Sequence, residues 1–353
     1  MSVTGSSVKR VAILGGNGFT GGELYRLLKR HPYFKVDFVS SESKAGLPLD
    51  KFFVSSARQK RSEGGKFQKL AALDGHYDFI FSCLPTGVLP RHIDHIAEHA
   101  EYVINVSGDY RLNDQELLRQ HYPESLSHPA QGGSHYFIPE FSDINLEAKV
   151  VNLPGCMAVA TIYTLFPLLA ANLIEPRVIS DAKTGSSGGG KASTEHHAER
   201  AHNFRPYKVH GHRHRPEIEF ALEEHLKRSV ELQFSVHSLD LPRGILVTSY
   251  SLLKEHASEI DVKKAFYGAY AAKPFVHYFN SQNGSYSYPM IKTTAGTNYA
   301  EVGAYVEGRN CVSIASIDNL IKGAAGQAIQ AANLYSGIAE EAGLQFELEG
   351  AWP

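Results

Sequence analysis

The chain has 353 residues, 43% hydrophobic and 20% charged, which suits two domains with buried cores and excludes a disordered protein. Lys and Arg number 35 and Asp and Glu 37, so a net charge of -2 favours neither nucleic acid nor a membrane as partner. The three cysteines are far apart and form no CxxC pair, which indicates a reducing compartment. Without a signal peptide or an apolar run of about 18 residues, we expect a cytoplasmic protein.

Strands and helices alternate in the first half of the chain. The predicted strands are Val11–Leu14, Val36–Val39, Tyr77–Phe81, Tyr102–Val106 and Lys149–Leu153. Helices are expected at about Gly18–Arg30, where Pro32 ends the pattern, and near Arg91–Ala100. Such alternation is typical of a parallel sheet with right-handed crossovers. Residues 1–155 are therefore predicted to form an α/β Rossmann-type nucleotide-binding domain.

The second half has a different texture. A helix is expected from Met157 to about Ala171, and a final alanine-rich helix over about Asp318–Tyr335. The β-rich runs between them are Leu232–Ser238, Gly244–Leu253, Tyr299–Val306 and Cys311–Ser316. This pattern predicts an α+β catalytic and dimerisation domain with a mainly antiparallel sheet, over residues 156–317.

A glycine-rich stretch follows the first predicted strand and opens the first helix. Glycines let the backbone approach a pyrophosphate, and the helix N-terminus supplies N–H donors, although a tight strand-to-helix turn needs glycine in any case. Because strand, helix and second strand come in the required order, we predict a dinucleotide site. Its expected contact residues are Gly15, Asn17, Gly18, Phe19, Thr20 and Gly21.

The end of the second strand bears on the choice of cofactor. Ser40 and Ser41 offer hydroxyls and Lys44 a positive charge, which suits the 2′-phosphate of NADP. Glu42 argues in the other direction, because an acid there can bind the ribose hydroxyl of NAD. The pattern favours NADP.

Cys156 follows a Pro-Gly pair and falls in the first turn of an apolar helix. A helix N-terminus stabilises a thiolate, so this position suits a nucleophile. A buried structural cysteine is the commoner fate of the residue, and we assign it to Cys83 and Cys311, each expected inside an apolar strand.

The segment 196–215 is basic, with six histidines and a single acid, Glu199. Metal binding is a poor interpretation, because the interleaved arginines repel a dication, and we predict no metal site. Two interpretations stay open: a solvated basic face, and an anion site in which one histidine is an acid/base group. The basic residues are Arg200, Arg205, Lys208, Arg213 and Arg215.

Taken together, these stretches resemble the N-acetyl-γ-glutamyl-phosphate reductase family, a relative of aspartate-semialdehyde dehydrogenase. The resemblance extends from Val11 to about Asn333. Its further marks are Leu84–Gly87, Ser107–Leu112, Pro139-Glu140, Pro154–Cys156, Gly185–Gly189, Gly211–Glu217, Arg243–Ile245 and Ile317–Gln327. So many motifs in the right order make the resemblance specific.

The resemblance implies a reaction. A Cys156 thiolate would attack an acyl phosphate, NADPH would reduce the thioester to a semialdehyde, and His214 would be the acid/base group. Arg111 would lie at the substrate phosphate, and His212 and Glu217 would also bind substrate. Further cofactor contacts are implied at Pro85, Gly185, Ser186, Ser187 and Asn319. A C-terminal helix, residues 318–353, would complete the nucleotide domain, and a homodimer or homotetramer is implied.

The substrate has two candidate blocking groups. Where the commonest family pattern after the cysteine is Tyr-Pro-Thr, this chain has Met157-Ala-Val159. Other stretches look more like a sister branch: Ser186-Ser187, His196–Arg200, Arg205–Tyr207, Gly211–His214 and Gly296–Tyr299. In that branch the glutamyl or aminoadipyl phosphate is attached to a small acidic amino-group carrier protein. The basic segment suits such a partner, so the sequence favours it over the free acetylated substrate. A non-catalytic NADP-binding sensor is the alternative from a different class.

Overall fold

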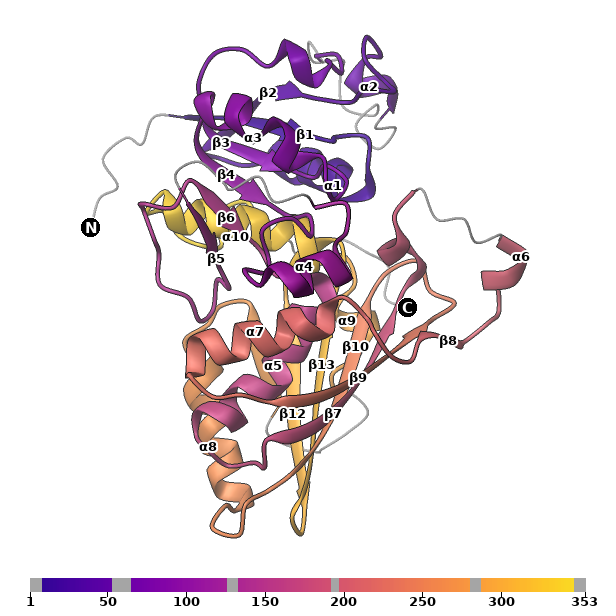
Figure 1. Cartoon of the computed structure of the whole chain (residues 1–353), viewed down its shortest axis with the longest axis vertical. Coiled ribbons are helices and arrows are strands. Elements are labelled where there is room, and N and C mark those ends of the chain that lie inside the picture. Colours follow the sequence, from indigo (N-terminus) through magenta and orange to yellow (C-terminus); the bar gives the residue numbers. More distant parts are fainter. Residues whose placement is uncertain (1–7, 53–64, 126–132, 192–196, 280–286, 346–353) are drawn as a thin grey trace. The chain divides into compact units, whose positions relative to one another are not determined.

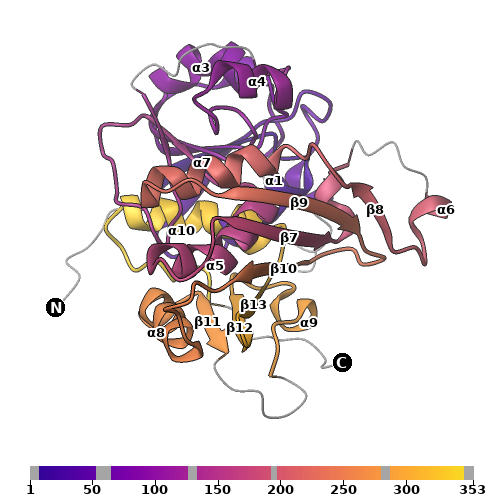
Figure 2. The same cartoon turned by 60° about the horizontal axis from the view of Figure 1, so that its bottom comes forward.

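The computed structural model describes residues 8–52, 65–125, 133–191, 197–279 and 287–345, which fall into two compact units (Figures 1 and 2). The first unit contains the described residues up to Pro139, with Asp143–Leu153 and Ala325–Gln345. The second contains Glu140–Ser142 and Pro154–Ala324. No helix of the described segments is long and apolar enough to cross a membrane.

The first unit is built on a parallel sheet in the order β2-β1-β3-β4-β6-β5. Its strands are β1 (Lys9–Leu14), β2 (Phe34–Val39), β3 (Tyr77–Ser82), β4 (Ala100–Asn105), β5 (Ser134–Tyr136) and β6 (Val150–Asn152). Its helices are α1 (Phe19–Leu28), α2 (Leu49–Phe52), α3 (Leu89–Glu98), α4 (Gln115–His121) and α10 (Gly326–Tyr335). The predicted Rossmann-type architecture is confirmed.

The register of this sheet positions its loops. Ile13 of β1 pairs with Val39 of β2 and with Phe81 of β3, so the carboxyl ends of the three strands meet at one edge. Residues 11–14 of β1 are fully buried, as expected for a continuous apolar run in a parallel sheet. Ligands of open parallel sheets bind outside this carboxyl edge.

The second unit contains a seven-stranded mixed sheet in the order β11-β12-β13-β10-β7-β9-β8. Its strands are β7 (Arg177–Thr184), β8 (Arg205–Lys208), β9 (Glu231–Ser238), β10 (Ile245–Leu252), β11 (Val276–Phe279), β12 (Ala300–Glu307) and β13 (Asn310–Ile317). Four of its pairs are antiparallel and two parallel, which confirms the mainly antiparallel sheet. Its helices are α5 (Cys156–Ala170), α6 (His197–Arg200), α7 (His214–Leu226), α8 (Glu259–Tyr270) and α9 (Ile291–Thr294).

One face of the second sheet is covered by helices (Figure 2). α5 packs on β10 and β13, α7 on β9, and α8 on β11 and β12. α5 is buried on nearly all sides, which explains why its sequence is apolar throughout. Burial alternates along β10, where Val247 and Ser249 are buried and Tyr250 is exposed, so the two faces of the sheet differ.

The last helix differs from its prediction. A π-helical turn, η4 (Ile321–Ala325), precedes α10, and α10 ends at Tyr335 where Gly337 adopts a positive φ of 66°. The predicted helix over 318–353 is therefore wrong in extent, and residues 346–353 lie outside the described residues. Cys83 directly follows β3 rather than lying inside a strand.

Candidate active site

The glycine loop lies between β1 and α1. Gly15 has a φ of 78°, and a Cβ there would lie 2.6 Å from Cys83 O, so only glycine fits this turn. α1 begins after Gly18 with no side-chain cap and no acidic residue in its first turn. The first N–H groups of a helix have no partner inside the helix and suit a phosphate. The residues present therefore fit a dinucleotide. Phe19 is exposed at the start of α1, and Asn17 donates to Ser43 Oγ at 3.4 Å.

The residues after β2 are tied to the glycine loop. Ser40 Oγ accepts a hydrogen bond of 3.1 Å from the Gly15 N–H, and both Ser40 and Ser41 are buried. The Glu42 carboxylate accepts a hydrogen bond of 2.8 Å from the Leu70 N–H. Glu42 therefore has a partner in the backbone of its own unit, which weakens the argument that it binds a ribose hydroxyl.

Two asparagines hold the loop that contains Arg111. Asn105 and Asn152 end the neighbouring strands β4 and β6, and Asn105 Nδ2 donates to Asn152 Oδ1 at 3.1 Å. Asn105 Nδ2 also donates to Asp109 O at 2.7 Å, and Asn152 Nδ2 donates to Tyr110 O at 3.0 Å. Tyr110 has a φ of 62°, a conformation that needs such support outside glycine. The amide pair thus fixes the backbone next to Arg111.

Arg111 is 5% exposed, and its Nη2 donates to Val106 O at 2.9 Å. Pro85 lies exposed in the loop after β3. In that loop the Gly87 N–H donates to Asp109 Oδ1 at 2.8 Å, so the two predicted ligand loops of the first unit are fastened together.

Cys156 is the first residue of α5, with Gly155 as the N-cap, and is partly buried. The Gly155 N–H donates a hydrogen bond of 2.7 Å to Glu217 Oε1. Glu217 is fully buried in the first turn of α7. The Glu217 carboxylate thus fixes the backbone immediately before Cys156. The predicted contact of Glu217 with the substrate stays a prediction.

His214 is the first residue of α7 and is buried. Residues three apart on a helix share a face, so His214 lies on the same face as Glu217, the residue bonded to Gly155. The link through Glu217 thus fastens the start of the helix that carries His214 to the start of the helix that carries Cys156.

His212 precedes α7 and bonds to the first residue of that helix. Its Nδ1 accepts a hydrogen bond of 3.1 Å from the His214 N–H, and its Nε2 lies 3.3 Å from the Tyr207 hydroxyl. An accepting Nδ1 leaves Nε2 as the ring nitrogen that can donate a hydrogen bond. The rings of His212 and His214 are 4.9 Å apart.

A second loop of the second unit holds predicted cofactor residues. A Cβ on Gly185 would lie 2.8 Å from Arg243 C, and the Gly185 N–H donates to Gly244 O at 2.8 Å. Asn319 Nδ2 donates to Ser187 Oγ at 2.9 Å, and its Oδ1 accepts from the Gly244 N–H at 2.8 Å. Asn319 therefore joins the 185–187 loop to the turn before β10. Ser186 O accepts a hydrogen bond of 2.7 Å from Arg200 Nη2.

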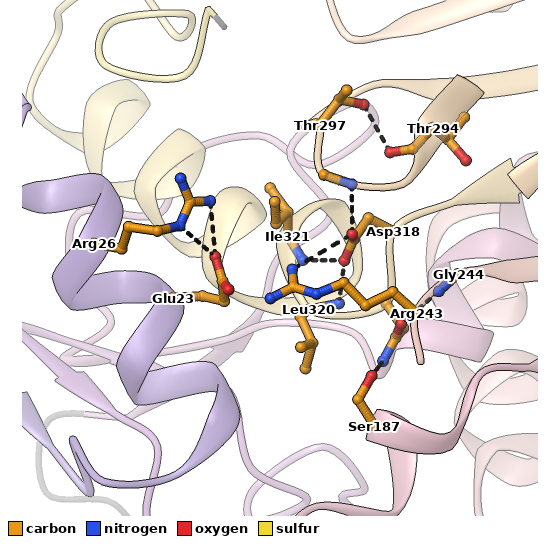
Figure 3. Close-up of polar contacts among 12 residues, drawn as sticks. Glu23, Arg26, Ser187, Arg243, Gly244, Thr294, Thr297, Asp318, Leu320 and Ile321 are labelled. Atoms are coloured by element: carbon orange, nitrogen blue, oxygen red, sulfur yellow. Dashed lines mark hydrogen bonds and ion pairs between the residues drawn. The ribbon is translucent and has the colours of Figure 1, made fainter. Parts of the chain in front are cut away.

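Asp318 organises the chain next to Asn319 (Figure 3). It is fully buried, and its carboxylate accepts hydrogen bonds from the N–H groups of Leu320 at 2.7 Å and Ile321 at 3.0 Å. Its Oδ2 also accepts from the Gly296 N–H at 2.7 Å and lies 3.6 Å from Arg243 Nη1. Sequence reasoning gave Asp318 and Arg243 no role, although both stand in motifs of the resemblance.

Two charged residues without a predicted role are also buried in the second unit. Lys322 Nζ lies 2.5 Å from Glu140 Oε1, and both side chains are almost completely excluded from solvent. The sequence signal that could have found them was a lysine inside the otherwise small and apolar run 321–325.

The other two cysteines lack the setting of Cys156. Desolvation raises the pKa of the Cys83 thiol above its usual range, and it raises the pKa of Cys311, inside β13, to about 11. Both thiols are therefore protonated at neutral pH and poor nucleophiles.

The basic segment divides into two kinds of side chain. Arg200 and Arg205 are half-buried, whereas Lys208, Arg213 and Arg215 are exposed, and Arg215 pairs with Glu219 at 3.2 Å. His196 lies outside the described residues. Within the described residues, His, Cys, Asp and Glu form no group of three or more that could hold a metal ion.

Two family models match the chain. Residues 10–150 match the semialdehyde dehydrogenase NAD binding domain, and residues 156–319 match the semialdehyde dehydrogenase dimerisation domain. The chain belongs to the semialdehyde dehydrogenase family. It is an oxidoreductase, and the sensor alternative is set aside.

Relatives along the whole chain carry two kinds of name. The chain is 47% identical to an N-acetyl-gamma-glutamyl-phosphate reductase 1 of Lactiplantibacillus plantarum, covering 98% of this chain and 100% of the relative. It is 36% identical to a [LysW]-L-2-aminoadipate/[LysW]-L-glutamate phosphate reductase of Sulfurisphaera tokodaii, covering 95% and 97%. The resemblance inferred from the motifs is confirmed.

Solved structures show the same fold. Aspartate semialdehyde dehydrogenase II of Vibrio cholerae matches with a TM-score of 0.72 at 15% identity, covering 94% of this chain and 99% of that one. The enzyme of Candida albicans matches with a TM-score of 0.65 at 16% identity, covering 93% and 99%.

Proposed function

We propose that the protein reduces the side-chain acyl phosphate of an amino-blocked glutamate or 2-aminoadipate to the semialdehyde, with release of phosphate. The observation that carries the proposal is the Gly155–Glu217 hydrogen bond, which joins the N-terminus of α5, with Cys156, to the first turn of α7, with His214. A nucleophile and a group that titrates near neutrality are the pair that acyl transfer through cysteine requires.

Cys156 is the proposed nucleophile. Its thiolate attacks the carbonyl carbon, a C–S bond forms, and the C–O bond to phosphate breaks, so phosphate leaves and a thioester remains on Cys156. The first-turn N–H groups of α5 stabilise both the thiolate and the oxyanion that develops on the carbonyl oxygen. Arg111 is the residue we propose for binding the phosphate, because guanidinium matches phosphate in charge and geometry.

His214 is the proposed acid/base group. It donates a proton to the developing oxyanion and takes it back when the thiohemiacetal collapses and Cys156 leaves as thiolate. Its burial at the start of α7 limits the motion of the ring, and the bond from its backbone N–H to His212 Nδ1 fixes the backbone that carries it. A fixed ring favours proton transfer because geometry decides the efficiency of a general acid.

NADP is the proposed cofactor. When bound, NADPH supplies the hydride that reduces the thioester. The uncapped start of α1 suits the pyrophosphate, and the engagement of Glu42 by Leu70 supports a 2′-phosphate over a ribose hydroxyl as the group near Ser41 and Lys44. The aspartate semialdehyde dehydrogenase of Candida albicans, which has the same fold, was solved with NADP. Measured KM values for NADP and NAD decide between them.

The acetyl group is our first candidate for the blocking group, because the relative at 47% identity is named for the acetylated substrate. The sequence alone favoured the carrier-linked substrate. That substrate is the second candidate, supported by relatives named for it at 36–37% identity and by the exposed Lys208 and Arg213. Turnover of both semialdehydes by the purified protein compares them directly.

A homodimer or homotetramer is the proposed assembly. On the face of the second sheet opposite its helices, Tyr250 of β10 pairs with Ile179 of β7, and both are exposed, as is Leu252. Large apolar side chains gathered on one sheet face are typical of an interface, and the matching family model is described as a dimerisation domain. Light scattering on the purified protein tests the assembly.

Replacement of Cys156 tests the proposed function. We expect Cys156→Ser to lose nearly all turnover of semialdehyde, phosphate and NADP, because a neutral hydroxyl is a far weaker nucleophile than a thiolate. Affinity for NADP, measured by titration calorimetry, should stay unchanged. Cys311→Ala is the control, since Cys311 is buried in β13, and it should retain turnover. Substantial turnover by Cys156→Ser would refute the mechanism.

A further inference from the structure

A buried ion pair of the second unit lies between two segments that are distant in sequence. Lys322 of η4 and Glu140 are 2.5 Å apart, and Lys322 Nζ also lies 5.4 Å from the centre of the Phe275 ring. Removing two charges from water costs free energy that hydrophobic side chains of similar volume would not require. A pair of this kind therefore calls for an explanation beyond stability.

Glu140 also holds the helix of the nucleophile. Its second carboxylate oxygen, Oε2, accepts a hydrogen bond of 2.6 Å from the Tyr163 hydroxyl. Tyr163 lies on α5, about two turns after Cys156. The Tyr270 hydroxyl of α8 donates to Tyr163 O at 2.7 Å, which fixes α5 from another side. A single carboxylate thus fastens η4 through Lys322 and α5 through Tyr163.

The residue after Lys322 is in contact with the nucleophile. A Cβ built on Gly323 would lie 2.6 Å from Cys156 Cβ and 3.2 Å from its Cα, so the backbone of η4 packs directly on Cys156. The Gly323 N–H donates to Asp318 O at 2.8 Å, which fixes the glycine within the turn. Gly323 has no positive φ, so the contact with Cys156, and not backbone strain, is what requires glycine here.

We infer that Lys322 and Glu140 are positioning residues for Cys156. Their ion pair holds η4 in place, so that the backbone of Gly323 packs against the cysteine and fixes its position. Lys322, which pairs with Glu140, and Gly323, which contacts Cys156, both lie in the π-helical turn η4, and such turns occur often at functional sites. The inference rests on the proposed role of Cys156 as nucleophile. The role inferred for Lys322 and Glu140 is exerted through the backbone of η4.

A neutral double variant, Glu140→Gln with Lys322→Met, tests the ion pair. The amide oxygen of the introduced glutamine would keep an acceptor for Tyr163, and no unpaired charge is left in the core. We expect a folded protein by circular dichroism, with an unchanged Kd for NADP and a kcat roughly 100-fold lower, the effect of misplacing a reacting group by about 1 Å. A kcat within about twofold of wild type, in the range ordinary for uninvolved positions, would overturn the inference.

Gly323→Ala tests the contact between Gly323 and Cys156 without changing a charged residue. Gly268→Ala is the matched control, because a Cβ on Gly268 of α8 meets nothing within 4 Å. The rate of Cys156 alkylation by iodoacetamide, followed against pH by peptide mapping, reports the thiol directly. We expect Gly323→Ala to change that profile and lower kcat by more than about tenfold, and Gly268→Ala to match wild type. A wild-type alkylation profile in Gly323→Ala would refute the inference that the Gly323 contact positions Cys156.

The two proposals fail differently. If Cys156→Ser retains turnover, Cys156 is not the nucleophile, and the proposed function is refuted as well. If Cys156→Ser has no turnover but Gly323→Ala has the kcat and the alkylation profile of wild type, the proposed function stands. In that case only the positioning role of the Gly323 contact is refuted. A lower kcat with unchanged alkylation in the double variant would assign the ion pair a role other than positioning Cys156.

Discussion

At the scale of the residue, replacing His214 distinguishes a role in proton transfer from a role in substrate binding. We expect His214→Asn to lower kcat by about 100-fold, because a positioned acid/base group contributes a factor of that order, while KM changes little. The loss should be accompanied by a flatter dependence of kcat on pH near neutrality. Steady-state kinetics from pH 6 to about 9 in both directions measure this.

His256→Asn is the matched control for that substitution. His256 is exposed in the turn before α8, so its replacement should leave kcat and its pH profile as in wild type. If His214→Asn raised only the KM of the substrate, His214 would become a binding residue. His212 would not inherit the acid/base role easily, because its Nδ1 already accepts from the His214 N–H.

His31 makes the stability of the first unit depend on pH. Burial lowers the pKa of its imidazole, and Nδ1 accepts hydrogen bonds from the Tyr33 and Phe34 N–H groups at 3.2 and 3.1 Å, so the folded state holds the neutral ring. The unfolded chain binds the extra proton below its ordinary pKa of about 6.5, so the free energy of unfolding falls as pH drops below that value. The slope is at most about 1.4 kcal/mol per pH unit and vanishes above neutrality.

His31→Asn should remove this dependence, because the amide oxygen can accept from the same backbone groups but does not titrate. The measurement is the difference in Tm between variant and wild type at pH 8 and at pH 5.5, which cancels the contribution of all other titrating groups. A difference that does not change with pH would show that His31 is not the group that titrates.

Single residues also show what a sequence can and cannot reveal. The Pro-Gly pair and the apolar run placed Cys156 in the first turn of a helix, and α5 begins at that residue. The partner of that turn could not be read in the same way, because Glu217 reaches Gly155 only through the packing of α7 on α5. A carboxylate that bonds to backbone leaves no periodic signal.

At the scale of the element, the loop between β4 and α4 depends on its two asparagines. Asn152→Asp keeps the acceptor for Asn105 but replaces the donor to Tyr110 O with a second acceptor. A buried group left unsatisfied costs about 1–3 kcal/mol, more when charged, so we expect a lower Tm. If Arg111 binds the substrate phosphate, a displaced loop should also raise the substrate KM. Thermal unfolding and steady-state kinetics measure the two effects.

Asn145→Asp provides the comparison for this loop. Asn145 is exposed in the same unit, and its Oδ1 accepts from the Glu147 N–H, a bond that aspartate keeps. We expect Tm and KM to stay close to wild type in this variant. A wild-type Tm in Asn152→Asp would mean that the backbone of the loop does not depend on the amide pair.

The elements with strong periodicity were the predictable ones. The apolar runs of β1 to β4 and of β9, β10, β12 and β13 gave strands within a few residues of their bounds. The prediction missed β5, β8 and β11, which have three or four residues each and no distinct pattern, and it also missed the eight-residue β7. The final helix was predicted as continuous because its composition is uniform, but the contact of Gly323 with Cys156 and the pairing of Lys322 are tertiary, and they replace its first turn by η4.

At the scale of the whole molecule, a net charge near zero hides local asymmetry. The fold class followed from the order of strands and helices, and it is confirmed. Exposure could not be predicted in that way: Arg200 belongs to the basic segment in sequence but bonds to Ser186 O, whereas Lys208 and Arg213 are exposed. The exposed pair is therefore the one that can guide a charged partner to the surface near β8.

Salt dependence tests which blocking group this surface serves. Raising the ionic strength from about 0.1 to about 1 M shortens the Debye length from about 10 to about 3 Å, which removes steering between protein surfaces. For the acetylated semialdehyde, we expect Lys208→Glu to match the control Lys264→Glu in kcat/KM at every salt concentration. Lys208 lies in β8 at one edge of the sheet, whereas Lys264 is exposed on α8, which packs on β11 and β12 at the other edge. With a carrier-linked substrate, kcat/KM would instead fall steeply with added salt, and it would fall in Lys208→Glu even at low salt, since the acidic surface of the carrier must meet the exposed basic residues. If only the carrier-linked substrate is turned over efficiently and shows that dependence, the acetyl group is not the blocking group.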